Sequence, residues 1–425
     1  VEPVDGGLFV GKYTVRTAGE YKMEVLYHEA HLQGSPFSVR VLPAPTHTGS
    51  CIRLFAQSED EPLADAVAGI ESSFEISARD AFGNVRLGGG ETFLGKFIGA
   101  ESTDAQVVDQ QDGSYKVRYT LRLAGEYLLS ITRGGEHIGG SRFALVVQPN
   151  ETHAPACRAY GQALHIGQAG THCSFNIEAR DQFSNLRMRG GDSFSVMLVG
   201  PQNVEGAVVD EGDGTYSASY RTTTVGHYSL CIYLAGEHVH GSPFELLISG
   251  GETHPPSCTK EAVPNAPNLQ GATETLSKIL PKSVAGAKCS FVIQARDCFG
   301  NPRGRGGDPF VCTLSGAQLL KADVGDNGDG TYLVSFAPSL AGDYLVAVTL
   351  NKQHICGSRY PLSVGAASAH ASACVVSGSG LHSATAGKMS KFALQAFDAY
   401  GNTTEVAPEE VEVRIVRRHD GGGGG

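Results

Sequence analysis

Short stretches of this chain alternate between hydrophobic and polar residues with a period of two. One stretch covers residues 175–179, and another covers residues 216–220, directly after Asp213-Gly214, a dipeptide typical of hairpin turns. Because successive side chains of a β-strand point to opposite faces, this alternation predicts half-buried strands. Further strands are expected in the same region at 157–160, 194–199, 228–232 and 244–248. About seven strands in about 100 residues predict an all-β domain.

Three short phrases recur in the same order along the chain, about 100 residues apart. The phrase Arg-Asp-x-Phe-x-Asn, or a close variant, begins at Arg79, Arg180, Arg296 and Phe397. The phrase Ala-Gly-Glu-Tyr, or a variant, ends at Tyr21, Tyr127, Tyr228 and Tyr344. A histidine followed by Gly-Ser and an aromatic residue occurs at His31, His137, His238 and His354. This period is too long for a solenoid and fits tandem domains, each expected to be an immunoglobulin-like β-sandwich.

The phrases divide the chain into three complete repeats and two partial ones. The complete repeats are predicted at residues 46–150, 151–251 and 252–366, the last with a surface insertion near 260–282. Residues 1–45 are predicted to be the C-terminal part of a repeat, and residues 367–425 the N-terminal part of another, ending in a glycine linker. The linkers between repeats are only a few residues long, so neighbouring repeats are expected to touch.

Composition and charge narrow the possible functions. Glycine accounts for 55 of 425 residues, as expected for a chain with many tight turns. A net charge of −11 argues against nucleic-acid binding, and no run of about 18 apolar residues predicts a membrane span. The chain begins at Val1 without methionine or a signal-peptide pattern, so we expect a fragment of a longer protein.

Polar residues in the first phrase resemble a metal site, but turn chemistry explains them better. Asp181 and Asn185 bracket a turn, where short polar side chains bond to nearby backbone amides. Calcium needs five or six oxygens from one loop, and no repeat supplies them. The tyrosines of the second phrase, such as Tyr228, occupy the position of a tyrosine corner, with a buried ring and a hydroxyl bonded to backbone.

A histidine precedes a cysteine by four residues near each predicted boundary. The four cysteines of these pairs are Cys51, Cys157, Cys258 and Cys374. Zinc needs four ligands and no further paired ligand accompanies them, so we expect no metal and no cofactor. Among the other cysteines, Cys173 and Cys289 share one strand position, and the rest, Cys231, Cys298, Cys312 and Cys356, have no repeated partner. Such unmatched thiols indicate a reducing compartment, which outweighs two glycosylation sequons at Asn150 and Asn402.

Residues repeated in every domain have structural explanations, and the sequence carries no nucleophile elbow or phosphate loop, so we expect no enzyme activity. The string Asp213-Gly214-Thr215-Tyr216, then Val225-Gly226-His227-Tyr228, then the segment 237–244 resembles the immunoglobulin-like repeat of filamin, the actin-binding protein 280. The opening of the last unit, residues 373–381, is similar too, so the resemblance covers nearly the whole chain. Filamin's actin-binding module is not recognisable in this sequence.

The resemblance implies where partners bind. Open sandwiches leave edge strands that can accept a partner's strand, and filamin partners typically add beside the third strand, in the groove between the third and fourth. The candidate residues are Phe93, Phe97 and Val107 in the first complete repeat, Phe194, Val196, Met197, Leu198 and Val208 in the second, and Phe310 and Leu314 in the third. Segment 194–199 is the most apolar, so a charged residue at Met197 or Val196 is expected to abolish binding without unfolding the repeat.

Two functions from different classes follow. The first is a non-enzymatic scaffold in the cytoplasm, which docks proteins such as receptor tails on an actin network or a ciliary axoneme. The alternative is an extracellular adhesion protein of gametes or other cell surfaces, since filamin-like repeats also occur there. An enzyme with regulatory filamin-like repeats would need its catalytic domain outside this segment. Free thiols and an unmodified Asn150 favour the first function.

Overall fold

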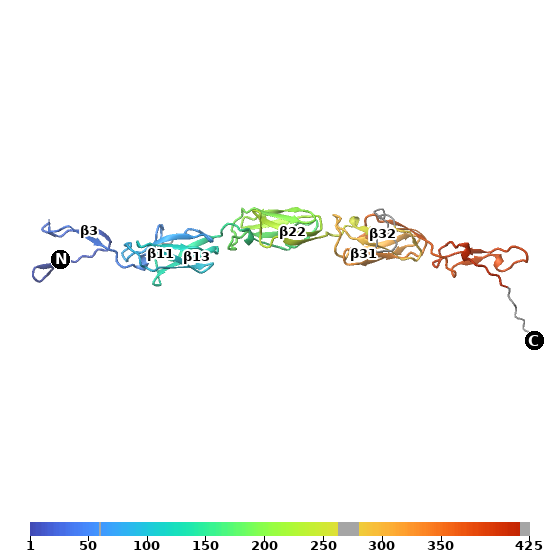
Figure 1. Ribbon diagram of the computed structural model, residues 1–425, viewed down its shortest axis with the longest axis horizontal. Coiled ribbons are helices and arrows are strands. Elements are labelled where there is room, and N and C mark those ends of the chain that lie inside the picture. Colours follow the sequence, from blue (N-terminus) through green and yellow to red (C-terminus); the bar gives the residue numbers. More distant parts are fainter. Residues whose placement is uncertain (59–60, 262–279, 417–425) are drawn as a thin grey trace, which may run out of the picture.

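Three sandwiches follow one another along the chain. The computed structural model describes residues 1–58, 61–261 and 280–416, so most of the insertion predicted near 260–282 lies outside the described residues. Figure 1 shows the sandwiches end to end in one extended row, with a smaller partial unit at each end. We refer to residues 46–150 as repeat 1, 151–251 as repeat 2 and 252–366 as repeat 3. In the part that the structure describes, no helix is long and apolar enough to span a bilayer.

The three repeats contain the same series of short strands. Repeat 1 has β7 (Ile52–Arg53), β8 (Ala66–Val67), β9 (Ser72–Ser77), β10 (Leu94–Gly99), β11 (Thr103–Asp109), β12 (Ser114–Tyr119), β13 (Gly125–Arg133), β14 (Glu136–His137) and β15 (Phe143–Gln148). Repeat 2 has β16 (Arg158–Tyr160), β17 (Ile166–Gln168), β18 (Cys173–Glu178), β19 (Phe194–Val199), β20 (Val204–Asp210), β21 (Thr215–Tyr220), β22 (Gly226–Leu234), β23 (Glu237–His238) and β24 (Phe244–Ser249). Repeat 3 has β25 (Thr259–Glu261), β26 (Ser283–Val284), β27 (Cys289–Gln294), β28 (Phe310–Gly316), β29 (Leu320–Lys321), β30 (Asp323–Asp326), β31 (Thr331–Phe336), β32 (Gly342–Leu350), β33 (Gln353–His354) and β34 (Tyr360–Gly365).

The partial units are simpler. The N-terminal unit has β1 (Glu2–Val4), β2 (Leu8–Val10), β3 (Gly19–Met23), β4 (Leu26–Tyr27), β5 (Ala30–His31) and β6 (Phe37–Val41), and the C-terminal unit has β35 (Val375–Ser377) and β36 (Ala393–Gln395). Short 3-10 turns lie at η1 (Thr48–Ser50), η2 (Ala154–Ala156), η3 (Gln162–Leu164), η4 (Pro255–Ser257), η6 (Ser379–Leu381) and η7 (Pro408–Glu410). The described residues form no α-helix, which confirms the predicted all-β fold class.

The fourth strand of each repeat passes from one layer of the sandwich to the other. In repeat 2 the strand order is β16-β18-β21-β20-β19-β22-β24-β17. The first half of β20 pairs with β19, where Glu205 lies opposite Met197, and its second half pairs with β21, where Val208 lies opposite Ala218. In repeat 3 the same crossing divides the fourth strand into β29 and β30, which belong to separate sheets.

The alternating pattern fills one hydrophobic core in each repeat. In repeat 2, Ile177, Leu198, Leu230 and Ile232 have no exposed surface. Full burial of each such side chain contributes about 1.5–3 kcal/mol. The buried residues that form the core of repeat 1 run in sequence from Cys51 to Val147, and those of repeat 3 run from Cys258 to Val364. Each repeat therefore has its own core.

Two of the repeated sequence phrases fix corners of the sandwich. The hydroxyl of Tyr228, whose side chain is almost fully buried, donates to the carbonyl oxygen of Thr224 at 2.9 Å, which confirms the expected tyrosine corner. Equivalent bonds join Tyr21 to Thr17, Tyr127 to Leu123 and Tyr344 to Leu340. In the third phrase, the Ser242 hydroxyl oxygen accepts the Ile232 amide at 2.9 Å and contacts Nδ1 of His238. The histidine and serine of that phrase thus shape the loop before the last strand.

The histidine–cysteine pairs have local roles. The Sγ of Cys157 donates to the carbonyl oxygen of His153 at 3.4 Å and has no exposed surface. Cys51 and Cys258 repeat this contact with His47 and His254. All ten cysteines lie in the described residues and are free thiols. Burial raises the pKa of the Cys312 thiol to about 12, so this thiol stays protonated and packs as a small apolar group.

Candidate partner-binding strands and repeat junctions

The third strand of each repeat is paired on both sides over part of its length. In repeat 2, β19 pairs with β22 from Phe194 to Val199 and with β20 from Val196 to Leu198. The third strands of repeats 1 and 3 have the same two kinds of neighbour, β11 and β13 for β10, and β29 and β32 for β28. The expected open edge is therefore closed only where the fourth strand pairs with the third, and docking beside the third strand stays a prediction.

Most of the side chains assigned to the groove belong to the core instead. Seven candidates are buried: Phe93, Phe97, Phe194, Val196, Leu198, Phe310 and Leu314. Val107, Met197 and Val208 are half-buried. Val196 is 1% exposed, so a charged residue there would enter the core rather than a binding surface. The expectation that a charged residue at Val196 leaves the repeat folded is therefore wrong. A partner would meet the backbone edge and only the half-buried side chains.

A short open edge remains at the start of each third strand. In repeat 2, Phe194 and Ser195 have no partner on the β20 side, because β20 turns toward β21 after Gly206. A Cβ at Gly206 would lie 2.8 Å from Cγ1 of Val196 and 3.0 Å from the Ser219 carbonyl oxygen. A side chain at position 206 would therefore crowd Val196, whereas repeats 1 and 3 have Ala105 and Ala322 at the corresponding point. After Gly206, β20 no longer pairs with β19, and we refer to residues 194–195 and 207–210, on the two strands beyond this point, as the notch.

The Asp-x-Phe-x-Asn phrase forms the expected turn. Oδ1 of Asp181 accepts the backbone amides of Phe183 and Asn185, each at 2.9 Å. Oδ2 of the same carboxylate accepts the Asn150 amide in the linker at 2.9 Å and the Asn185 side-chain amide at 2.8 Å. The carboxylate has no exposed surface. One aspartate therefore joins the turn of repeat 2 to the linker that leads into the repeat.

The asparagine of the phrase reaches the preceding repeat, which the sequence did not reveal. The Asn185 side-chain nitrogen donates to the Arg122 carbonyl oxygen at 2.8 Å, and its Oδ1 accepts the Ala124 amide at 2.9 Å. The same pair of contacts joins Asn84 to Arg16 and Ala18, Asn301 to Thr223 and Val225, and Asn402 to Ser339 and Ala341. We call this aspartate–asparagine arrangement the junction clamp. Its one sequence signal was the fixed spacing of the two residues in every unit.

An aromatic ring of the same phrase packs against a glycine of the preceding repeat. A Cβ at Gly170 would lie 2.3 Å from Cε2 of Phe299, and a Cβ at Gly69 would lie 2.3 Å from the same atom of Phe183. Gly286 faces Tyr400 in the same way. These glycines have φ between +76° and +82°, a conformation that favours glycine. Because glycine has no side chain, the aromatic ring of the next repeat can pack directly against the backbone at these positions.

Hydrogen bonds lower the pKa of three junction aspartates, Asp80, Asp297 and Asp398. Burial by itself raises the pKa of Asp80, but hydrogen bonds from the Asn84 side chain and from backbone amides, including that of Ala44, lower it to about 2. The pKa of Asp398 is also lowered to about 2 by the equivalent bonds, and that of Asp297 is lowered. These three carboxylates are therefore charged near neutral pH.

An arginine that follows the Asp-x-Phe-x-Asn phrase also binds the linker. Nη1 of Arg187 donates to the carbonyl oxygen of Asn150 in the linker, and Nη1 of Arg303 donates to that of Gly251 at 2.7 Å. In the last unit Thr404 replaces the arginine and donates to Ala367 at 2.9 Å. Each linker is thus held by a carboxylate on its amide side and by a donor on its carbonyl side. The described residues contain no group of three or more potential metal ligands.

Comparison with known proteins agrees with this architecture. The description Filamin/ABP280 repeat matches residues 56–144, 151–245 and 270–361, which together make up more than half of the sequence. The chain belongs to the filamin repeat family. It is 24% identical to Filamin-A of Drosophila melanogaster over 436 residues, covering 98% of this chain and 17% of that protein. It is 25% identical to Filamin-C of Rattus norvegicus over 464 residues, covering 99% of this chain and 16% of that protein.

A solved structure also resembles the filamin repeats of this chain. The Escherichia coli adhesin FdeC shares 19% identity with a TM-score of 0.48, over 76% of this chain and 99% of that chain. This likeness concerns the fold alone. Because the chain spans about a sixth of the length of the two filamins, the activity of a whole filamin is not carried over to it.

Proposed function

We propose that this chain is a non-enzymatic scaffold that holds docking sites at fixed spacing along a stiff row of filamin repeats. The observation that carries this proposal is the junction clamp, which recurs at all four contacts between neighbouring units. Each clamp ties a turn, a linker and the preceding repeat together through one buried carboxylate and one amide. An array with such contacts transmits position and force from one partner to another better than a chain with free hinges.

The scaffold is proposed to act in the cytoplasm, on a cytoskeletal assembly such as an actin network or a ciliary axoneme. Ten free thiols support a reducing compartment, because exposed and half-buried cysteines such as Cys298 and Cys173 would oxidise readily outside cells. The similarity to filamins over nearly the whole chain supports the same setting. The alternative, an extracellular adhesion protein, predicts disulfides or modified thiols in the native protein. Mass spectrometry of the thiols in protein from its source separates the two.

Partners, for example the cytoplasmic tails of membrane receptors, are proposed to dock by strand addition at the notch of repeat 2. Ser195 is exposed, and the backbone of Phe194 and Ser195 has no strand on the β20 side. An extended segment can pair there and continue toward the second half of β20. Met197, half-buried on the same strand, is the side chain that such a segment would contact.

Hydrogen exchange tests the docking proposal directly. A partner peptide should slow amide exchange at residues 194–195 and 207–210 in the full chain, and Met197→Glu should remove that protection. Val107, the counterpart of Val208 in repeat 1, offers a control: Val107→Glu should leave exchange in repeat 2 unchanged. Protection confined to any other strand would contradict docking at the notch.

A further inference from the structure

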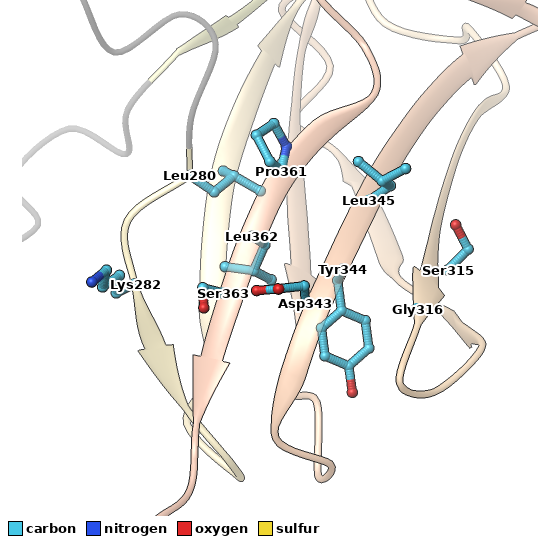
Figure 2. Close-up of a pocket in the computed structure, with 10 residues that line it drawn as sticks. All are labelled: Leu280, Lys282, Ser315, Gly316, Asp343, Tyr344, Leu345, Pro361, Leu362 and Ser363. Carbon is cyan, nitrogen blue, oxygen red and sulfur yellow. The ribbon is translucent and has the colours of Figure 1, made fainter.

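Each sandwich has a hollow on its surface beside its second strand, which is β8 in repeat 1, β17 in repeat 2 and β26 in repeat 3. In repeat 3 it has a volume of 700 Å³ and is bordered by Lys282 and Asp343, so both signs of charge line it (Figure 2). In repeat 1 the corresponding hollow is 590 Å³ and contains Asp65 and Glu126. In repeat 2 the hollow is larger, 820 Å³, and it continues across the junction onto repeat 3.

The hollow of repeat 2 differs from the other two in its chemistry. Ile166, Leu247 and His227 lie side by side across β17, β24 and β22. The strand register places Ile166 where repeats 1 and 3 have Asp65 and Lys282, and His227 where they have Glu126 and Asp343. Ile166 is 68% exposed and Leu247 is 45% exposed. The floor of this hollow is therefore apolar and lacks the carboxylates found in its counterparts.

Repeat 3 adds positive charge to the far end of the same hollow. Arg303 and Arg305 both line it, and the whole lining contains no carboxylate. Arg303 is 8% exposed, and its Nε has no hydrogen-bond partner although Nη1 binds Gly251. Arg305 is exposed and free to meet a ligand in solvent. The nearest carboxylate on β24, Glu245, lies two residues from Leu247 and outside the lining.

The edge of β17 gives the hollow a backbone to bind. This strand is the last in its sheet and pairs only with β24 among the described residues. Its bonds to β24 use alternate residues, as in Leu247 N–H to His165 O and Ala169 N–H to Ser249 O, both 2.9 Å. In a parallel pair the intervening residues, Ile166 and Gln168, turn their amide and carbonyl groups away from the neighbour. The Gln168 carbonyl oxygen already accepts the Thr171 hydroxyl at 2.8 Å, so the outward groups left for a ligand are the amide and carbonyl of Ile166 and the amide of Gln168.

We propose that the groove across the junction of repeats 2 and 3 binds an extended acidic peptide. The peptide pairs with the outer edge of β17, places apolar side chains on Ile166 and Leu247, and directs carboxylates toward Arg303 and Arg305. Charge complementarity selects this occupant, because apolar and basic groups line the hollow and no carboxylate does. The carboxylate of Asp326, near Arg305 in repeat 3, lies outside the lining and accepts the Gly307 amide at 2.7 Å. The site is distinct from the notch at β19. Because residues of both repeats line the groove, the site forms only while the junction is intact.

A labelled peptide tests the proposal on the full chain. The probe is a fluorescent peptide of sequence Thr-Val-Thr-Val-Thr-Asp-Glu-Asp, and binding is measured by fluorescence anisotropy at low salt. Arg305→Glu should weaken binding about tenfold or more, and His227→Glu, which restores the acid of the other repeats, should also weaken it. The matched control is Arg189→Glu, which makes the same change at the corresponding position of the junction between repeats 1 and 2, where the arginine does not line the hollow of repeat 1. It should leave binding unchanged.

Several results would overturn the inference. These are the absence of saturable binding, equal loss in Arg189→Glu, equal affinity for a peptide ending in lysines, or stronger Arg305-dependent binding to anionic vesicles than to the peptide. If Met197→Glu abolishes peptide binding while Arg305→Glu does not, the peptide occupies the notch; the groove is then excluded and the proposed function stands. Thermal unfolding of each variant confirms that the repeats remain folded.

Discussion

The side-chain nitrogen of Asn185 lies 2.8 Å from the carbonyl oxygen of Arg122, a residue of the preceding repeat. The same nitrogen donates to the buried carboxylate of Asp181, so one amide connects the turn of repeat 2 to the end of repeat 1. This contact joins two units that fold around separate cores. The proposed stiffness of the array rests on this contact and its counterparts at the other junctions.

Asn185→Ala is expected to loosen the first complete junction without unfolding either repeat. The change removes two contacts to repeat 1, worth about 1–2 kcal/mol in total, and leaves both cores intact. Small-angle scattering should show a broader distribution of end-to-end distances. Asn176→Ala, at an exposed position on β18, is the control and should change nothing. An unchanged distance distribution for Asn185→Ala would mean that the linkers alone set the geometry.

Acid should weaken the junctions before it unfolds the sandwiches. Burial opposes the charge of Asp80, but hydrogen bonds hold its folded pKa at about 2, below the value of about 3.9 in an unfolded chain. A group with a lowered folded pKa stabilises the fold above the unfolded value, and this contribution disappears as the pH falls toward about 2. Carboxyl carbon NMR should show Asp80 titrating near pH 2. In Asp80→Asn, stability should vary less with pH between about 4 and 2.

Neighbouring residues on β19 should respond in opposite ways to the same charge. Val196→Glu places a carboxylate in the core and is expected to cost repeat 2 about 3 kcal/mol or more. Met197→Glu lies on the half-buried outer side of the strand and should cost less than about 1 kcal/mol. Urea unfolding of the full chain, followed through repeat 2, measures both. Equal destabilisation would contradict the inward orientation of Val196.

The alternation of residues such as Phe175, Ile177 and Ala179 was sufficient to predict the sandwich, because period-two burial depends on local sequence. The tyrosine corner at Tyr228 was predictable for the same reason, since its partner Thr224 lies four residues away. The exposure of β19 was not predictable in this way. Alternation shows which face of a strand is buried, but it does not show which strand lies alongside. The crossing of β20 is defined by its pairing with β19 and then with β21, which are separate segments of the sequence. The role of Asn185 was hidden because its partners belong to another repeat.

Gly170→Ala should separate repeats 2 and 3. The new Cβ would lie 2.3 Å from the Phe299 ring, and alanine disfavours the φ of +82° at this position. We expect the ring to leave its contact and the junction to lose about 1–2 kcal/mol. Limited proteolysis between residues 249 and 254 should become faster. Gly236→Ala is a matched control, because Gly236 has φ +87° and no neighbour within 4 Å. Equal effects of the two changes would assign the loss to backbone strain alone.

A glycan on Asn402 is incompatible with the last junction clamp. Its side-chain nitrogen donates one hydrogen to Asp398 at 2.8 Å and the other to Ser339 at 2.9 Å, and N-linked attachment replaces one of them. Chains secreted from a eukaryotic host and glycosylated at Asn402 should therefore show faster exchange of the Ala341 amide, which bonds to Asn402 Oδ1. The sequon at Asn150 provides the comparison, because its nitrogen donates a single bond, to Ala68. A glycan there should leave exchange of the Ala124 amide unchanged, and a protected Ala341 amide in glycosylated Asn402 chains would refute the clamp at that junction.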